Sequence, residues 1–132
     1  STGTVRMYSS IGGSAPLHCT SVAKAILAHL PTEQLDGLLR DWSFTKHTDS
    51  TITALNDLLQ ELELTRQRGY SVDSREHEDF VHCVGVPILP EGQDVRFSLS
   101  LTAPVFTTSW EELTSHIPKL KAAAANIAAE LS

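Results

Sequence analysis

The feature that most constrains the fold is a strict alternation of side chains between residues 95 and 102. One set of positions is apolar and the other polar or charged: Val95, Phe97, Leu99 and Leu101 against Arg96, Ser98, Ser100 and Thr102. This two-residue period is that of a β-strand with two unlike faces. A second β-prone run extends from Phe80 to Ile88, and Pro90-Glu91-Gly92-Gln93 provides a turn between the two runs. The segment 80–102 is therefore predicted to form an antiparallel hairpin.

Helical periodicity dominates the sequence on both sides of this hairpin. Apolar residues recur at helical spacing in segments 21–29 and 52–68, and Pro31-Thr32-Glu33 starts a short helix between them. Gly69 supplies a stop signal for the long helix. A further helical stretch begins at the Ser109-Trp110-Glu111-Glu112 capping box, and Pro118 is expected to divide it.

Two more short strands complete the expected order of elements. Thr4 to Tyr8 is β-prone at the start of the chain, and Tyr70 to Val72 follows the long helix. The order is thus strand, helices, three strands and helix, which favours an α+β fold with helices packed on a mostly antiparallel sheet.

Composition limits the classes of function. The chain has 132 residues, enough for one domain with its own core, and a formal net charge of -6 without a basic cluster. Nucleic-acid binding by these residues is therefore not expected. Neither a membrane-spanning run nor a signal peptide is recognisable. The two cysteines do not form a disulfide framework, so a reduced, cytoplasmic location is expected.

The segment from Pro16 to Ala25 is the first candidate for a binding site. It is a tight polar loop that turns directly into an apolar helix, with Thr20 and Ser21 as capping residues. The unpaired N–H groups at such a helix start attract small anions. Because the loop lacks GxGxxG and GxxxxGK[ST] motifs, a small carboxylate is favoured over a nucleotide phosphate.

Later residues allow both structural and functional interpretations. Ser98 and Ser100 leave the same face of their strand, which is consistent either with a solvent-facing row or with the wall of a pocket. Cys83 lies among valines and by itself indicates a buried small residue, whereas Asp73 alone indicates a turn.

Histidine and cysteine recur together and raise two alternatives. A zinc site using His18-Cys19 and His82-Cys83 is disfavoured, because adjacent residues of a strand point to opposite faces. A Cys-dependent hydrolase-like enzyme would use Cys83 with a histidine and Asp73. The residues around Cys83 provide neither a nucleophile turn nor a signal of a lowered thiol pKa, so we expect no enzyme, no metal and no cofactor.

An ordered set of short motifs resembles the C-terminal effector-binding domain of IclR-type bacterial transcription regulators. The set covers nearly the whole chain: Pro16-Leu17-His18-Cys19-Thr20-Ser21, Lys24-Ala25, Leu27-Ala28, Phe44-Thr45, Thr51-Ile52, Leu62, Arg66-Gln67-Arg68-Gly69-Tyr70-Ser71-Val72-Asp73, Glu76-His77, Cys83, Pro87, Phe97-Ser98-Leu99-Ser100 and Pro104. The resemblance implies a GAF-like α+β domain over residues 1–132, with a curved, mostly antiparallel sheet flanked by helices.

The resemblance also implies a ligand pocket on the sheet. The corresponding residues here are Thr20, Ser21, Val22, Asp73, Cys83, Ser98 and Ser100. The guest would be a small-molecule effector, a small carboxylate or a 2-oxo or sugar acid. Val22-Ala23 and Phe80 stand where the family usually has glycine, so we expect added bulk near the pocket.

Partners follow from the same resemblance. A homodimer or tetramer is expected, with the helix over 52–68 and the C-terminal helix as candidate subunit contacts. DNA would be bound, as by a repressor, only through the family's N-terminal winged helix-turn-helix, which these residues do not contain. No membrane partner is expected.

Overall fold

A computed structural model describes residues 6–11 and 15–132, so Thr4 and Val5 of the expected first strand lie outside the described residues. The elements follow one another in this order: β1 (Arg6–Ile11), α1 (Ser21–Leu27), α2 (Thr32–Leu39), α3 (Leu55–Arg68), β2 (Ser71–Ser74), β3 (Val81–Ile88), β4 (Phe97–Pro104), α4 (Trp110–Thr114) and α5 (Ile117–Leu131). The α+β class predicted from the alternating periods is confirmed.

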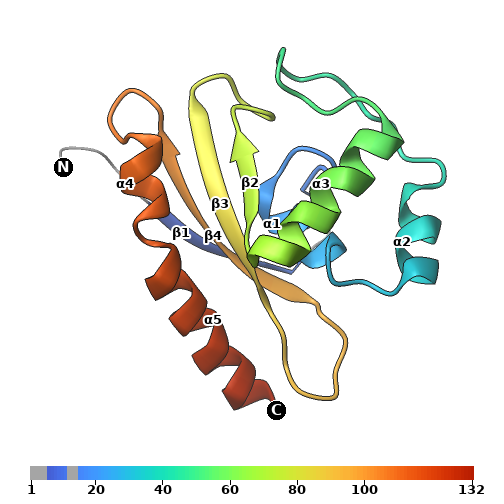
Figure 1. Cartoon of the computed structure of the whole chain (residues 1–132), viewed down its shortest axis with the longest axis vertical. Coiled ribbons are helices and arrows are strands. Elements are labelled where there is room, and N and C mark those ends of the chain that lie inside the picture. Colours follow the sequence, from blue (N-terminus) through green and yellow to red (C-terminus); the bar gives the residue numbers. More distant parts are fainter. Residues whose placement is uncertain (1–5, 12–14) are drawn as a thin grey trace.

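The strands form one antiparallel sheet in the order β1-β4-β3-β2 (Figure 1). The predicted hairpin is β3 and β4, with Gly85 opposite Ser100 and Val86 opposite Leu99. The strand β4 begins at Phe97, two residues later than the alternation indicated. Asp73, expected in a turn, lies within β2 and pairs with Cys83 because β2 is longer than predicted.

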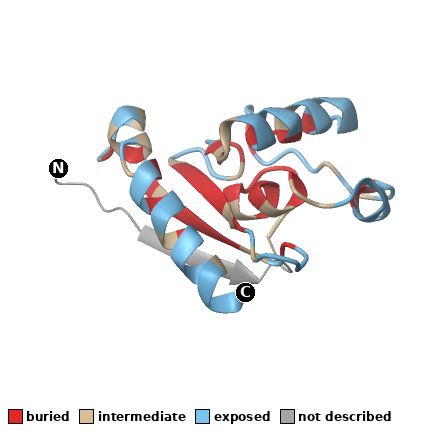
Figure 2. Cartoon of the chain, turned by 60° about the horizontal axis from the view of Figure 1, so that its bottom comes forward, coloured by how far each residue is buried: buried red, intermediate tan, exposed pale blue. Residues whose placement is uncertain are grey.

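Helices cover both faces of this sheet (Figure 1). The helix α1 packs directly on β3 and β4, and α3 packs against α1 and β2. On the other face, α4 and α5 pack against β3 and β4. Buried residues accordingly concentrate in the sheet and on the inner sides of the helices (Figure 2).

The helix boundaries agree with the local signals. Gly69 ends α3 in the left-handed conformation at φ 85°, which costs glycine little. Pro118 lies in the first turn of α5, after α4 has ended at Thr114, so the expected division of the C-terminal stretch is confirmed.

The apolar face of α3 is narrower than its sequence suggests. Leu58 and Leu62 are buried, but Leu55 and Leu59 are exposed, and the helix begins after Ile52 rather than at it. Among the described residues, no helix is both long and apolar enough to cross a bilayer.

Candidate functional site

The start of α1 is held against the sheet by complementary small residues. A methyl group at Gly85 would lie 2.7 Å from the carbonyl oxygen of Ser21 and 2.7 Å from Ser71 Oγ, so only glycine allows this approach. Thr20 caps the helix as predicted: its Oγ1 accepts from the Ala23 N–H at 3.3 Å and donates to the carbonyl of Pro16 at 2.9 Å.

A pocket of about 330 Å³ opens between the start of α1, the β2–β3 turn and strands β3 and β4. Its lining consists of Thr20, Ser21, Val22, Asp73, His77, Glu78, Val81, Cys83, Ser100 and Thr102. The fold thus brings together every predicted site residue except Ser98. The polar face of β4 is a buried wall under α1, because Ser98 and Ser100 are 0% and 3% exposed.

Ser98 has a different position from the other predicted residues. Its Oγ donates to the carbonyl of Val22 at 2.8 Å, so it ties β4 to the first turn of α1. It does not line the pocket. Its hydroxyl therefore positions the α1 wall rather than facing a ligand directly.

Phe80 also lies apart from the pocket lining. Its side chain is 56% exposed and packs against Phe106, with ring centroids 5.1 Å apart. Of the two departures from the family pattern, it is therefore Val22 that contributes bulk to the pocket wall.

Asp73 is the acidic group at the buried end of the pocket. Its Oδ1 accepts the Glu76 N–H at 2.8 Å, and the residue is 4% exposed. Burial raises the pKa of the Asp73 carboxyl to about 6, with the charge of Glu76 adding to the effect. Asp73 can therefore accept a hydrogen bond from a ligand hydroxyl or, when protonated, donate one.

A buried ion pair lies directly behind this carboxylate. Lys24, fully buried in α1, donates to the carbonyl of Val72 at 2.8 Å and pairs with the carboxylate of Glu76. The pair joins the α1 wall to the β2–β3 turn. Because Lys24 and Glu76 are distant in the chain, the spacing of residues around them gave no sign of this contact.

The β2–β3 turn is also held from outside. Thr51 Oγ1 donates to the carbonyl of Glu76 at 2.6 Å, and Thr48 Oγ1 donates to that of Arg75 at 2.6 Å. Arg75 has a positive φ of 61°, uncommon for a residue with a side chain. These bonds hold the turn in this conformation and place His77 and Glu78 at the pocket.

Cys83 is a wall residue rather than a nucleophile. Burial and the charge of Asp73 raise the pKa of its thiol to about 12, and Thr102 Oγ1 donates to its Sγ at 3.0 Å. A thiol in this state is neutral near pH 7, whereas the attacking species is the thiolate. The geometry therefore gives no support to a Cys-dependent hydrolase.

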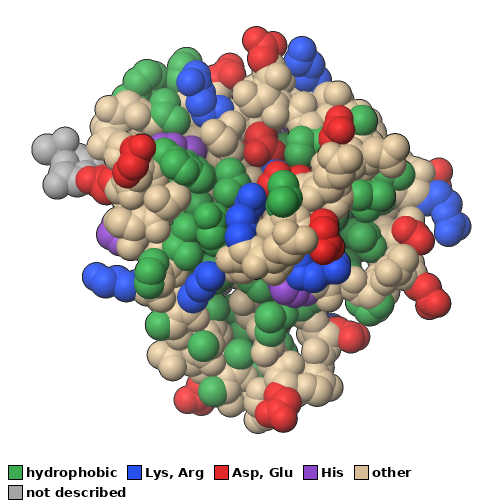
Figure 3. Space-filling view, in the orientation of Figure 1, with side chains coloured by type: hydrophobic (Ala, Val, Ile, Leu, Met, Phe, Trp, Pro, Cys, Tyr) green, Lys and Arg blue, Asp and Glu red, His purple; other side chains and the backbone are tan. Residues whose placement is uncertain are grey.

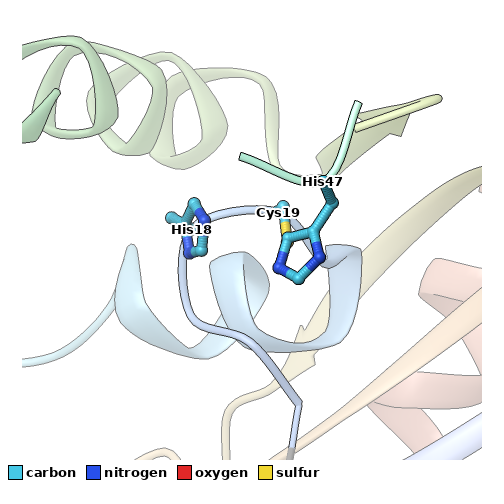
Figure 4. Close-up of side chains that lie close together, drawn as sticks. All are labelled: His18, Cys19 and His47. Atoms are coloured by element: carbon cyan, nitrogen blue, oxygen red, sulfur yellow. The ribbon is translucent and has the colours of Figure 1, made fainter. Parts of the chain in front are cut away.

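A second cluster of potential ligand atoms lies beside the pocket. Atoms of His18, Cys19 and His47 lie within 4.8 Å of one another (Figure 4). The Trp42 indole N–H donates to His18 Nδ1 at 2.9 Å, and His18 Nε2 lies 2.8 Å from the carbonyl of Thr45. The neutral imidazole with its proton on Nε2 satisfies both bonds and leaves no free lone pair.

The cysteine of that cluster is equally unsuited to a metal. Burial raises the pKa of the Cys19 thiol to about 12, and the charges of Asp73 and Glu76 add to this, which opposes the thiolate that a metal would need. In this arrangement the cluster does not fit a metal centre. The sequence-based zinc alternative also fails on its other pair, since His82 packs near Trp110 while Cys83 lines the pocket.

Comparisons with known proteins agree on one family. The family model described as bacterial transcriptional regulator IclR C-terminal matches residues 1–129. The regulator KdgR of Dickeya chrysanthemi is 34% identical over 96% of this chain and 42% of its own length. XynR of Escherichia coli K12 is 34% identical over 88% of this chain and 46% of its own length. The chain spans about half the length of such curated relatives.

Solved structures give the same result. The C-terminal domain of KdgR from E. coli superposes with a TM-score of 0.80 at 31% identity, over 86% of this chain and 70% of that one. The inducer-binding domain of a double mutant of PobR from Acinetobacter, in complex with 3-hydroxybenzoic acid, has a TM-score of 0.78 at 26% identity. That match covers 86% of this chain and 66% of the other.

Proposed function

The chain belongs to the IclR family of bacterial transcriptional regulators, as the C-terminal domain, and we propose that this domain senses a small carboxylic acid carrying a hydroxyl or oxo group. It is a regulatory domain and not an enzyme, in agreement with curated relatives that are named as transcriptional regulators. This confirms the family that the ordered motifs indicated.

The observation that carries the proposal is the convergence of polar side chains from four separate segments on one pocket. Thr20 and Ser21 come from the start of α1, Asp73 from β2, Cys83 from β3 and Ser100 from β4. The hydroxyl and thiol side chains of this buried face are short, so they leave a space that a small ligand can occupy, with polar groups around it.

The chemistry of the lining supports the ligand class. Asp73 would hydrogen-bond a hydroxyl of the effector, and Ser100 a hydroxyl or oxo group. The carboxylate would face the first turn of α1 at Ser21 and Val22. The related PobR domain is consistent with this class, because 3-hydroxybenzoic acid combines a carboxylate with a hydroxyl group.

We further propose how effector binding changes the DNA affinity of the complete regulator. The effector would bind one arrangement of this domain better than another, and its influence on DNA affinity would be limited by that difference. DNA would be contacted by a separate N-terminal winged helix-turn-helix. The assembly would be a homodimer or tetramer with α3 and α5 at subunit contacts, where Leu59 and Ile127 are exposed. The proposed location is the cytoplasm.

A thermal-shift panel of 2-oxo acids, sugar acids and hydroxybenzoic acids tests the sensor proposal. An effector present at about 100 times its Kd should stabilise the chain by about 2.7 kcal/mol. Ser100→Ala should weaken that stabilisation, whereas Ser115→Ala, on the α4 side of the sheet, should not. If no acid in the panel stabilises the chain, or if the Ser100 variant responds like the wild type, the assignment of this pocket is wrong.

A further inference from the structure

The pocket has more acidic groups than basic groups that could bind a ligand carboxylate. Two acids, Asp73 and Glu78, contribute to its lining. The nearest ammonium group, that of Lys24, is fully buried and already held by the carbonyl of Val72 and the carboxylate of Glu76. It is therefore engaged in structure and is not free to receive an anionic ligand.

His77 has the complementary chemistry. Among the described residues that line the pocket, it is the one whose side chain can present a ring N–H or a positive charge. No ion pair joins it to Asp73 or Glu78 within the described part of the chain. Its imidazole is half-buried, whereas Asp73 at the other end is 4% exposed. By the same measure Glu78, the next residue after His77, is exposed, so the mouth of the pocket presents an imidazole donor together with a solvated carboxylate, and the buried end presents Asp73.

The position of His77 is fixed by the contacts of its neighbours. It directly follows Glu76, whose carbonyl accepts from Thr51 and whose N–H donates to Asp73. Its ring also stands edge-on to that of His47, with centroids 4.9 Å apart and planes at 87°. A fixed backbone and one ring contact limit the orientations of this imidazole, so less freedom is lost when a ligand binds to it.

We propose that His77, held edge-on by His47, is the specificity-determining residue that recognises the effector's carboxylate. The effector enters with its hydroxyl toward Asp73 and its carboxylate toward the mouth, where His77 adds a side-chain donor to the α1 wall. A second acid group at the inner end would meet the Asp73 carboxylate, so the pocket selects monocarboxylic hydroxy or oxo acids over dicarboxylic ones. This inference rests on the proposed function and extends it to the class of ligand.

The test compares each acid with its neutral amide on the same carbon skeleton. Binding of pyruvate, D-gluconate and 3-hydroxybenzoate to the 132-residue chain is measured by calorimetry, together with pyruvamide, gluconamide and 3-hydroxybenzamide. His77→Gln should weaken binding of the preferred acid about tenfold, the effect of one charge-assisted hydrogen bond, while the amide is unaffected. His77→Lys should retain the preference for the acid. His116→Gln, at the start of α5, is the matched control and should change neither.

The outcomes separate the two proposals. If His77→Gln binds acid and amide with the same ratio as the wild type, the role of His77 is wrong although the pocket still binds acids. Equal losses for acid and amide would also overturn it, because they indicate a structural effect. If none of the three acids binds the wild-type chain, the proposed function itself is contradicted.

Discussion

The two faces of the sheet carry different kinds of side chain, apolar on one face and short or polar on the other. On the α5 face, Val84 and Leu99 belong to an apolar cluster completed by Leu120 and Ala124. On the α1 face, alternate residues of the same strands are Cys83, Gly85, Ser98 and Ser100, and a lysine–glutamate pair is buried beside them. The α5 face of the sheet is held by apolar burial. The α1 face is joined to its helix by hydrogen bonds beside a buried ion pair, and the apolar cluster on that side lies among α1, α2 and α3.

The difference explains where a ligand can be accommodated. An apolar face gains stability by filling space, since each cavity lowers the free energy of unfolding. The α1 face instead keeps side chains short, and its polar groups are held by specific partners such as Val22 for Ser98. On the surface, basic and acidic side chains are interspersed over the face of the molecule shown in Figure 3. The asymmetry lies in the interior.

The largest expected effect comes from breaking the ion pair on the α1 face. Glu76→Ala leaves the fully buried Lys24 ammonium without its carboxylate and should lower the free energy of unfolding by about 4 kcal/mol. Urea denaturation at pH 7 measures this. The control is Glu63→Ala, which removes an exposed pair with Arg66 and should cost less than about 1 kcal/mol.

A combined substitution sharpens that result. Replacing both partners, as Lys24→Met with Glu76→Leu, should cost less than Glu76→Ala alone, because no unpaired charge remains. If Glu76→Ala proved no more harmful than Glu63→Ala, polar contacts would not be what holds the α1 face together.

The next effect concerns the α5 face. Leu120→Ala removes a side chain that is 2% exposed and should lower the free energy of unfolding by about 3 kcal/mol. Effector affinity should be unchanged, because the pocket lies on the other face. The control is Lys119→Ala, at an exposed position on the same helix, which should lower the free energy of unfolding by less than about 1 kcal/mol. A Leu120→Ala chain that stays folded but loses effector binding would show that the faces are coupled.

Local sequence signals predicted the scaffold well because each of those elements is specified by neighbouring residues. The alternation over residues 95–102 and the turn before it specify the hairpin, and Gly69 marks the end of α3. Apolar spacing alone does not identify the buried residues of α1. Val22 and Ile26 are half-buried, whereas Lys24 is fully buried, because α1 lies between the sheet and α3 and has little exposed surface.

The pocket depends on contacts between distant residues, which local patterns do not encode. Asp73 becomes a wall residue only through its pairing with Cys83, and Ser100 only through its position opposite Gly85. Taken alone, Asp73 indicated a turn and Cys83 a core residue, whereas Ser100 was consistent either with a solvent-facing strand or with a pocket wall. Resemblance to a family supplied the site, and sheet register explains why its members converge. His77, Glu78, Val81 and Thr102 were absent from that expectation, although Thr102 shares the polar face of β4.

The smallest expected effect is the pH dependence of stability that Asp73, on the polar face, produces. The folded-state pKa of Asp73, about 6, lies above its ordinary value of 3.8 because burial disfavours the charged form. Ionisation is therefore harder in the folded chain than in the unfolded one. The stability contributed by protonated Asp73 is fully present below about pH 4 and is lost as the pH rises through 6.

Asp73→Asn isolates this contribution, since asparagine does not titrate and its side-chain oxygen can still accept the Glu76 N–H. Measured without effector, the stability of the wild type relative to Asp73→Asn should fall by about 2 kcal/mol between pH 4 and pH 7. His18, His29 and His82, whose pKa values burial lowers, are present in both proteins, so their opposite pH dependence cancels in the difference. A difference that stays constant with pH would mean that the Asp73 carboxylate is as well solvated in the folded chain as in water. In that case the buried end of the pocket would not be strongly desolvated, and the α1 face would not differ from the α5 face in the way described above.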